Sequence, residues 1–356
     1  MGGRCLKTRK FNFLFRSVVL FVLCPALLTS LTVAVLAGEA ASGQAGDGVD
    51  WVLGDDGHLE IMGSGYINEY SSNDMPWSPY TSFITELTVY DGVRSVSDWA
   101  FADCSKLVSA SFPDSLEYMG AYAFQNATSL VDVTLPSSLY NIPDHAFDNC
   151  PMLRLDSLPY GIDSIGPYAF WGCKSLALQD LPDSVTSIGA YAFHSCDDLA
   201  LTTLPSELKA IPDYAFGNCP NLALQALPEG ITSIGYRSFY RCDKLSFFLS
   251  PQISKIDASA FQESLAPIRY HPSNEVALAA KQDTWRLCKF GDANTDDEID
   301  VGDAQYVFYA YTTGSRSSAE SKACGDVNNN GVLDLQDAQL ILLKILENQG
   351  FPVEAQ

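Results

Sequence analysis

A 23-residue interval organises most of this chain. Phenylalanine recurs at that step, with the last copy one residue early: Phe101, Phe124, Phe147, Phe170, Phe193, Phe216, Phe239 and Phe261. Cysteine, proline and isoleucine recur in the same register, and Ala127 fills one gap among Cys104, Cys150, Cys173, Cys196, Cys219 and Cys242. A unit of this length cannot bury its apolar side alone, so copies stack and share a continuous core. The sequence therefore predicts a solenoid of about eight units over residues 93–267.

Each unit has room for a short strand and tight turns, but not for a regular helix. The run 199–204 ends at Pro205, which cannot donate to a ladder and should close a strand. Residues 187–196 should then turn back through Gly189. The leucine spacing changes along the chain, from LxxVxL in 130–135 to LxLxxL in 176–181, 199–204 and 222–227. We expect the exposed strand face to be offset in these middle units.

The pattern LPxxLxxIxxxAFxxCxxL resembles the bacterial leucine-rich repeats of the BspA type over about residues 93–265. This resemblance implies an α/β repeat solenoid built mostly of short strands and tight turns. It also implies a binding role, because members of that family are mostly surface proteins. The fold alone does not name a ligand.

The first 40 residues predict a secretory signal. Five basic residues lie in the first 16, an apolar run covers 17–37, and small residues surround Ala37 and Ala40. This order is typical of a cleaved leader and predicts a secreted, extracellular protein. An apolar run of this length could also remain as a membrane anchor.

Atypical segments should cover both ends of the stack. The N-terminal cap, residues 41–92, should contain a hairpin over 51–63 with its turn at Asp56 and Gly57, and a strand over 87–90. Trp51, Trp77 and Phe83 are its expected core. The C-terminal cap, residues 268–290, should contain strands at 268–270 and 286–290 around a helix at 274–283.

The chain is strongly acidic, with a formal net charge of −22. Without residues 1–40 it carries 16 basic and 42 acidic residues, a net charge of −26. Binding to phosphates requires clustered Lys and Arg. We therefore exclude nucleic acid as a partner, and also a membrane once the leader is removed.

Two repeated columns have competing interpretations. The cysteines could form disulfides or bind metal, but equivalent side chains in stacked turns stay about 4.8 Å apart, too far for a disulfide, so we interpret them as buried free thiols. The second column is a stripe of aromatic residues along the solenoid. It could bind an extended ligand, mainly through Tyr122, Tyr168, Tyr191 and Tyr214, or its side chains could pack against one another. It comprises Trp99, Tyr122, His145, Tyr168, Tyr191, Tyr214 and Arg237.

Catalysis is the weakest interpretation. The four histidines, His58, His145, His194 and His271, are placed by repeats or caps, and no nucleophile and base must meet. Acidic pairs such as Asp180 with Asp197 or Asp198 arise by chance on so acidic a surface. The sequence predicts a protein that is not an enzyme.

The last segment, 291–356, contains one motif written twice, 34 residues apart: GDANTDDEIDVGDAQYVF and GDVNNNGVLDLQDAQLIL. Oxygen side chains stand at loop positions 1, 3, 5, 9 and 12, and short helices should follow at 304–311 and 338–346. A hard cation such as calcium needs six or more oxygen ligands, which this pattern supplies.

The pair of motifs resembles a type I dockerin, a small all-α module that binds cohesin modules of a scaffoldin in cellulosomes. The resemblance implies two Ca²⁺ ions, bound by Asp292, Asn294, Asp296, the carbonyl of Glu298, Asp300 and Asp303, and by Asp326, Asn328, Asn330, the carbonyl of Val332, Asp334 and Asp337. Gly331 suits the left-handed turn at position 6, whereas Asp297 does not, but the first loop carries more charge. We expect unequal affinities without ranking them.

Positions 10 and 11 of the loops, which contact cohesin in that family, are Val301, Gly302, Leu335 and Gln336. They differ between the halves, which predicts one preferred binding orientation. Cys288 and Cys324 precede the loops. The resemblance to dockerins implies halves that pack antiparallel with their loops at opposite ends, so we expect no bond between these cysteines.

The sequence as a whole predicts a secreted, non-catalytic binding protein. It would be anchored through a dockerin to a cellulosome or cell surface, and its solenoid would bind a polysaccharide, a protein or a cell surface. The alternatives are a free-standing adhesin and a dockerin-bearing polysaccharide hydrolase.

Overall fold

The structure is a computed structural model that describes residues 39–72, 74–250, 252–264, 268–270, 276, 287–289, 291–295, 298–314, 324–328 and 332–348. The predicted leader lies outside these residues except for its last two, and the predicted helix 274–283 lies outside them except for Val276. None of the helices in the described part of the chain combines the length and the apolar character that a membrane span requires.

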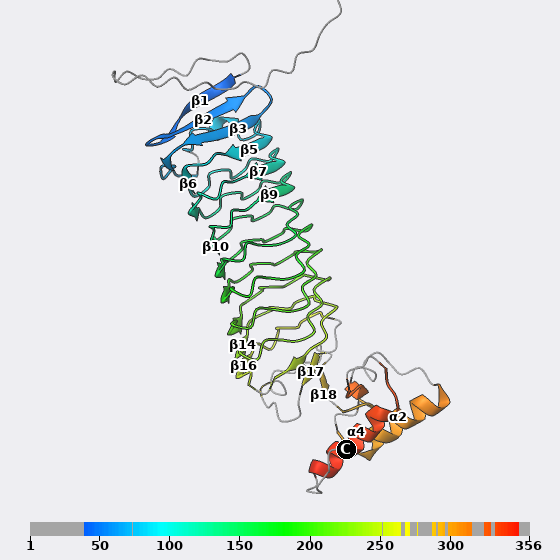
Figure 1. Ribbon diagram of the computed structural model, residues 1–356. Helices are drawn as coiled ribbons and strands as arrows, with labels where there is room; N and C mark the ends of the chain where they lie inside the picture. The colour runs from blue at the N-terminus through cyan, green and yellow to red at the C-terminus, as the bar shows by residue number, and fades with distance from the viewer. Residues whose placement is uncertain are drawn as a thin grey trace, which may run out of the picture. The chain divides into compact units, whose positions relative to one another are not determined.

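The N-terminal cap joins a β-hairpin to the first strands of the solenoid. Strands β1 (Glu39–Gly46), β2 (Val49–Gly54) and β3 (His58–Gly63) pair antiparallel, and the predicted turn at Asp56 and Gly57 is confirmed. Strand β3 then pairs in parallel with β5 (Glu86–Val89), followed by β7 (Ser109–Ser111) and β9 (Asp132–Thr134). The hairpin thus occupies the edge that the first repeat would otherwise expose (Figure 1).

Tryptophan fills the cap core. Trp51 and Trp77 are buried, and the Trp77 ring stacks on Phe101 with centroids 5.6 Å apart while its Nε1 donates to the Ala100 carbonyl at 2.6 Å. The cap therefore continues the phenylalanine ladder. The prediction that Phe83 belongs to this core is wrong, because its side chain is 39% exposed and the adjacent Ile84 is the buried residue.

A second ladder of short parallel strands, divided into three three-stranded sheets, runs along the serine–isoleucine pairs. Its strands are β4 (Gly65–Tyr66), β6 (Val93–Val96), β8 (Tyr118–Met119), β10 (Asn141–Ile142), β11 (Ser164–Ile165), β12 (Ser187–Ile188), β13 (Ala210–Ile211), β14 (Ser233–Ile234) and β16 (Lys255–Ile256). The repeated isoleucines point into the core. Residues 187–196, expected to form only a turn, therefore begin with a strand.

The strands predicted in the leucine runs of the middle units are absent. Residues 176–181, 199–204 and 222–227 form no strand, and the ladder of β9 ends in one bridge between Asp132 and Arg154. In the pattern LxLxxL, two buried leucines such as Leu201 and Leu204 are three residues apart at the place where the strand was expected. In a strand, side chains that point to the same face are two residues apart, so this spacing does not fit a strand. This ladder returns with β15 (Phe248–Leu249), β17 (Ile268–Tyr270) and β18 (Leu287–Lys289), and the last two strands were predicted.

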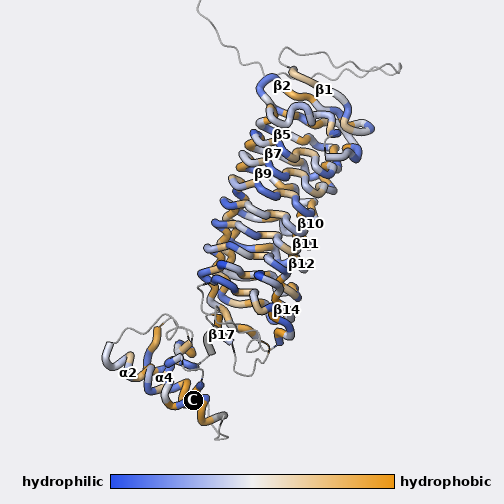
Figure 2. Tube along the Cα trace, turned by 180° about the vertical axis from the view of Figure 1, so that it is seen from behind, coloured by the Kyte–Doolittle hydropathy of each residue, from blue (hydrophilic) through white to orange (hydrophobic). Residues whose placement is uncertain are grey.

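The AFxxC segments close each unit without a helix. The N–H groups of Tyr191, Phe193 and Ser195 donate to carbonyls of the next turn at 2.9–3.0 Å, and equivalent residues do so in the other units. Tyr191 and Ser195 have φ of 59° and 62°. Since alternate N–H groups bond to the next turn, the described residues between 93 and 264 contain no α-helix. Figure 2 shows hydrophobic and hydrophilic positions recurring turn after turn.

The C-terminal segment is a separate helical pair, α2 (Val301–Thr313) and α4 (Leu335–Asn348). Both helices were predicted and both begin earlier than expected. Asp300 caps α2 in a capping box with Asp303, and Gly314, at φ 62°, ends it. The two helices share a small core with the residues Ala293, Ala304, Val307, Ala338, Ile341 and Ile345.

The phenylalanine ladder predicts a position-dependent stability. Phe193 is fully buried between Phe170 and Phe216, with centroids 5.4 and 5.5 Å away, so Phe193→Ala should lower the free energy of unfolding by about 3–5 kcal/mol. Phe261 stacks on Phe239 near the end of the ladder, so Phe261→Ala should cost less than the same change in the middle. Urea unfolding measures both, and equal losses would contradict a nearest-neighbour solenoid.

Candidate functional site

The aromatic stripe is a continuous stack of rings. Centroids of successive rings from Trp99 to Tyr214 lie 4.4–5.0 Å apart, with interplanar angles of 6–16°. The rings are half-buried, and their faces cover one another. Tyr122, Tyr168, Tyr191 and Tyr214 therefore pack as the structural alternative expects, and only ring edges and hydroxyl groups remain for a ligand.

The backbone explains why this column is regular. Every stripe residue from Trp99 to Arg237 has a φ between 48° and 59°, the left-handed region that bulky residues rarely adopt. Each N–H from Trp99 to Tyr214 donates to the next turn. His145 is also held by Asp148, whose Oδ2 lies 2.7 Å from Nδ1. Neighbouring turns thus impose one ring orientation throughout the stack.

The repeat cysteines are buried free thiols, as predicted. The Sγ atoms of Cys150, Cys173, Cys196, Cys219 and Cys242 each donate to the carbonyl of a phenylalanine in the preceding turn, at 3.0–3.1 Å. Burial raises the pKa of Cys104 and Cys219 to about 12. Burial therefore favours the neutral thiol in this column.

One serine–histidine contact was not anticipated. Ser195 Oγ lies 2.9 Å from Nδ1 of the adjacent His194, and Asn218 Nδ2 donates to the same Oγ at 3.1 Å. Asn149 and Asn126 occupy the same column in earlier units, and Asn149 Nδ2 donates to the side chain of Asn126. Ser195 thus replaces an asparagine in a structural ladder. Burial lowers the pKa of His194.

The two C-terminal loops have the same geometry. In the first, Asp303 accepts the N–H of Asn294 at 3.1 Å and that of Asp300 at 2.8 Å. In the second, Asp337 accepts the N–H of Asn328 at 3.2 Å and that of Asp334 at 2.9 Å. The duplicated sequence therefore folds into duplicated loops around a central aspartate.

The buried carboxylates of these loops fit a hard cation. Asp292, Asp303, Asp326 and Asp337 are all buried. Burial raises the pKa of Asp303 and of Asp337, and the charges of Asp292 and Asp326 add to it. Oxygen donors that repel one another in a buried site are the ligands calcium prefers.

Part of each predicted ligand set lies outside the described residues, namely Asp296 and Asn330, as does Asp297. In the described part of each loop, no group of three or more His, Cys, Asp or Glu side chains forms a metal cage. The predicted sets also use asparagine and carbonyl oxygens, from Asn294, Asn328, Glu298 and Val332. The full ligand sets remain predictions.

The starts of the two loops lie side by side. The N–H of Gly291 donates to the carbonyl of Cys324 at 2.9 Å, and a Cβ atom on Gly325 would lie 2.9 Å from that of Ala293. The expectation that the loops lie at opposite ends is therefore wrong at this point, and the argument against a Cys288–Cys324 bond no longer applies. Cys324 is disulfide-bonded, and its partner lies outside the described side chains.

Helices α2 and α4 form an apolar groove of about 390 Å³ from equivalent positions. Its lining pairs residues 34 apart: Val301 with Leu335, Ala304 with Ala338, Gln305 with Gln339, and Phe308 with Leu342. Val301, Leu335, Phe308 and Leu342 are 41–55% exposed. Of the four predicted cohesin contacts, Val301 and Leu335 lie in this groove, whereas Gly302 and Gln336 follow them outside its lining.

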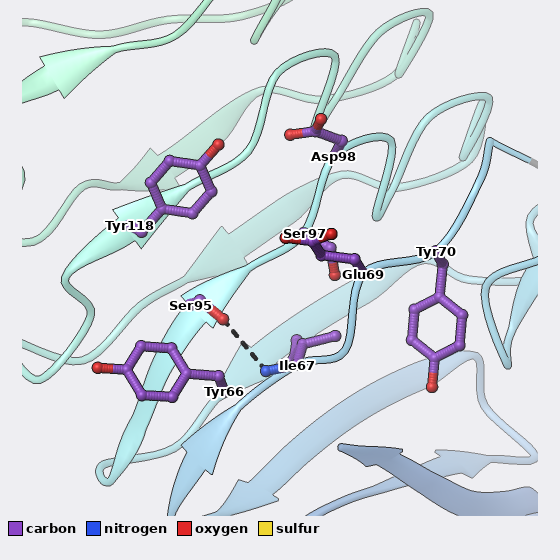
Figure 3. Close-up of a pocket in the computed structure, with 8 residues that line it drawn as sticks. All are labelled: Tyr66, Ile67, Glu69, Tyr70, Ser95, Ser97, Asp98 and Tyr118. Carbon is purple, nitrogen blue, oxygen red and sulfur yellow. Dashed lines mark hydrogen bonds between the residues drawn. The ribbon is translucent and has the colours of Figure 1, made fainter. Parts of the chain in front are cut away.

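A second pocket, of about 500 Å³, lies where the second ladder begins, and sequence reasoning missed it (Figure 3). Tyr66, Ser95 and Tyr118 come from β4, β6 and β8, and Glu69 and Asp98 from the loops that follow β4 and β6. Exposed tyrosines at strand positions where other units have small residues could have indicated it.

Residues 79–266 match the family model of the BspA type leucine rich repeat region, in the spans 79–176 and 153–266. The chain belongs to this family of repeat proteins, which are non-catalytic in kind.

Three crystal structures illustrate the similarity. A T. pallidum leucine-rich repeat protein is 29% identical over 54% of this chain and 86% of its own, with a TM-score of 0.41. One from Bacteroides ovatus is 21% identical over 63% and 70%, with a TM-score of 0.38. A leucine-rich cell surface protein from Faecalibacterium prausnitzii is 20% identical over 68% and 98%, with a TM-score of 0.33. No curated protein matches the chain.

The buried thiols predict a stability that falls at high pH. In the unfolded chain they titrate near pH 9, but in the folded protein Cys104 and Cys219 titrate near 12. Their contribution is complete below pH 9 and is lost between pH 9 and 12, because only the unfolded state releases thiol protons there. Each thiol lowers the free energy of unfolding by at most about 1.4 kcal/mol per pH unit.

Urea unfolding at pH 8 and pH 10 measures this loss. The Cys104→Ala variant is a matched control, since Ala127 already occupies the same column, and it should lose less stability between the two pH values. An equal loss in the variant would contradict the assignment.

Proposed function

We propose that this is a secreted binding protein whose solenoid carries the ligand-binding surface and whose C-terminal module docks, with calcium bound, to a cohesin module of a scaffoldin. The observation that supports docking is the internal duplication of the C-terminal module. Two equivalent aspartate-centred loops each lead into a helix, and the two helices contribute equivalent residues to one exposed apolar groove.

Calcium would link the loops to the groove. Asp300 accepts the N–H of Gly302 at 2.6 Å and so fixes the start of α2, while Asp334 accepts that of Gln336 at 2.8 Å and fixes the start of α4. The same two aspartates are predicted ligands. An ion that neutralises each buried acidic loop would therefore also stabilise the helix starts that present Val301 and Leu335.

The two halves of the groove are similar but not identical. Val301 and Phe308 on α2 stand where α4 has Leu335 and Leu342. A partner that fits the larger Phe308 side chain would bind less well after a half-turn of the module. This difference supports the proposal of one preferred cohesin orientation.

The remaining parts of the proposal come from the leader and the solenoid. A basic, apolar and small-residue N-terminus supports export, and the resulting location is extracellular, on a cellulosome or cell surface. The stacked turns offer an extended surface for a polysaccharide, a protein or a cell-surface ligand.

Calcium binding should show two sites by titration calorimetry of the full chain. Asp303→Asn and Asp337→Asn each remove one charged oxygen from a different loop, so each variant should lose one of the two ions. Asp198→Asn, an exposed carboxylate in the solenoid, is the control and should retain both. Two ions in both loop variants, or none in the native chain, would refute the calcium assignment.

Docking should depend on the groove without altering the metal. Val301→Asp or Leu335→Asp places a charge in the apolar lining and should weaken capture by a cohesin module at least about tenfold, with two calcium ions still bound. Tyr309→Asp changes a side chain that is 63% exposed on α2 but outside the lining, and should bind normally. Full capture by a Val301→Asp, Leu335→Asp double variant would exclude docking through this groove, and full capture of native protein in excess chelator would exclude calcium-dependent docking.

A further inference from the structure

The pocket in Figure 3 is formed by one row of side chains across the second ladder. Tyr66 pairs with Ser95, and Ser95 pairs with Tyr118, so two tyrosines flank one small, buried serine. Two strand spacings separate them, about 10 Å. The row therefore leaves a slot above Ser95 that is wide enough for a flat ring.

The two tyrosines are not required by the repeat. The equivalent positions in later units are small or polar: Asn141, Ser164, Ser187, Ala210, Ser233 and Lys255. Tyr66 is 54% exposed and Tyr118 is 42% exposed, so neither contributes much to the core. Among the described strand positions of this column, Tyr66 and Tyr118 are the two aromatic residues, and both line the slot, which a ligand explains better than core packing does.

Two polar side chains of the pocket, Asp98 and Ser95, are held in place by backbone N–H groups. Asp98 accepts the N–H of Ala121 through Oδ1 at 2.8 Å, and the Tyr118 hydroxyl points toward Asp98 in Figure 3. Partial burial, followed by the charge of Asp98, raises the pKa of Tyr118, so its hydroxyl remains a donor. Ser95 Oγ accepts the N–H of Ile67 at 3.1 Å and closes the floor.

Charge and size restrict the ligand. Among the residues that the structure describes, no Lys, Arg or His lines the pocket. Arg94 nearby is paired with Glu117, which also accepts the hydroxyl of Tyr66 at 2.9 Å. Anionic ligands would therefore meet Glu69 and Asp98 without a compensating charge. A volume of about 500 Å³ suits one or two sugar units better than a small ammonium ion.

We infer that this pocket binds a neutral sugar at the end of a glycan, with the ring packed against Tyr118 and Tyr66 and its hydroxyl groups donating to Glu69 and Asp98. The inference rests on the proposed binding role of the solenoid and names its site and ligand class. It does not depend on the calcium loops.

The test is titration of the full chain with neutral sugars (glucose, galactose, mannose, xylose and cellobiose). Binding is measured by saturation-transfer NMR and calorimetry. Glucuronate and tetramethylammonium serve as anionic and cationic probes. At least one neutral sugar should bind. Tyr118→Ala should weaken that binding about tenfold, and Glu69→Gln, which changes only an exposed side chain, should also weaken it. Tyr140→Ala, 56% exposed in the next unit and outside the lining, should not.

Absence of binding by every neutral sugar, or unchanged affinity in both Tyr118→Ala and Glu69→Gln, would overturn the inference. Binding of tetramethylammonium or glucuronate in place of the sugars would also overturn it. The same titration in excess chelator should give the same sugar affinity, and sugar binding that required calcium would remove it from this pocket. Loss of cohesin capture in that chelator reports on docking alone, so the two proposals fail separately.

Discussion

Hydrogen bonds between successive turns are the constraint on which the rest of the solenoid depends. In the units that start at stripe residues Trp99 to Tyr214, the N–H groups of the stripe residue, the phenylalanine and the fourth residue after the stripe donate to three equivalent carbonyls of the next turn. These bonds require left-handed backbone at two positions per unit, including bulky residues such as Tyr191. Repetition makes the arrangement tolerable, because each turn holds its neighbour in the strained conformation.

The same register organises three side-chain ladders. The buried phenylalanines stack at 5.3–5.8 Å, the aromatic stripe at 4.4–5.0 Å, and the thiols donate to phenylalanine carbonyls. A fixed backbone spacing brings equivalent side chains into contact. A residue type that packs well at one repeat position therefore packs well at the equivalent position of the neighbouring units. Function then appears where the repetition stops, as in the slot between Tyr66 and Tyr118.

The two ends of the chain solve different problems. At the N-terminus, the hairpin of β2 and β3 and the ring of Trp77 continue the ladders and cover the first unit. The C-terminal module has too small a core to rely on packing alone, since few apolar residues lie between α2 and α4. Its loops instead concentrate buried carboxylates, and under the calcium proposal a bound ion would supply the missing stability.

The 23-residue period determined the solenoid and the buried phenylalanine and cysteine columns, because these follow from side-chain chemistry repeated at a fixed step. The turn at Asp56 and Gly57 separately predicted the hairpin of the cap. The duplicated acidic motif likewise predicted both C-terminal helices. Only the tertiary structure decided which half of each unit forms strands, because residues 187–188 and 199–204 both include apolar side chains. The strand lies at 187–188, whereas the three-residue leucine step in 199–204 breaks the two-residue alternation of a strand. It also decided that Phe83 is exposed, that Gly291 meets Cys324, and that Tyr66 and Tyr118 flank Ser95, because these contacts join residues distant in the sequence that no local pattern relates.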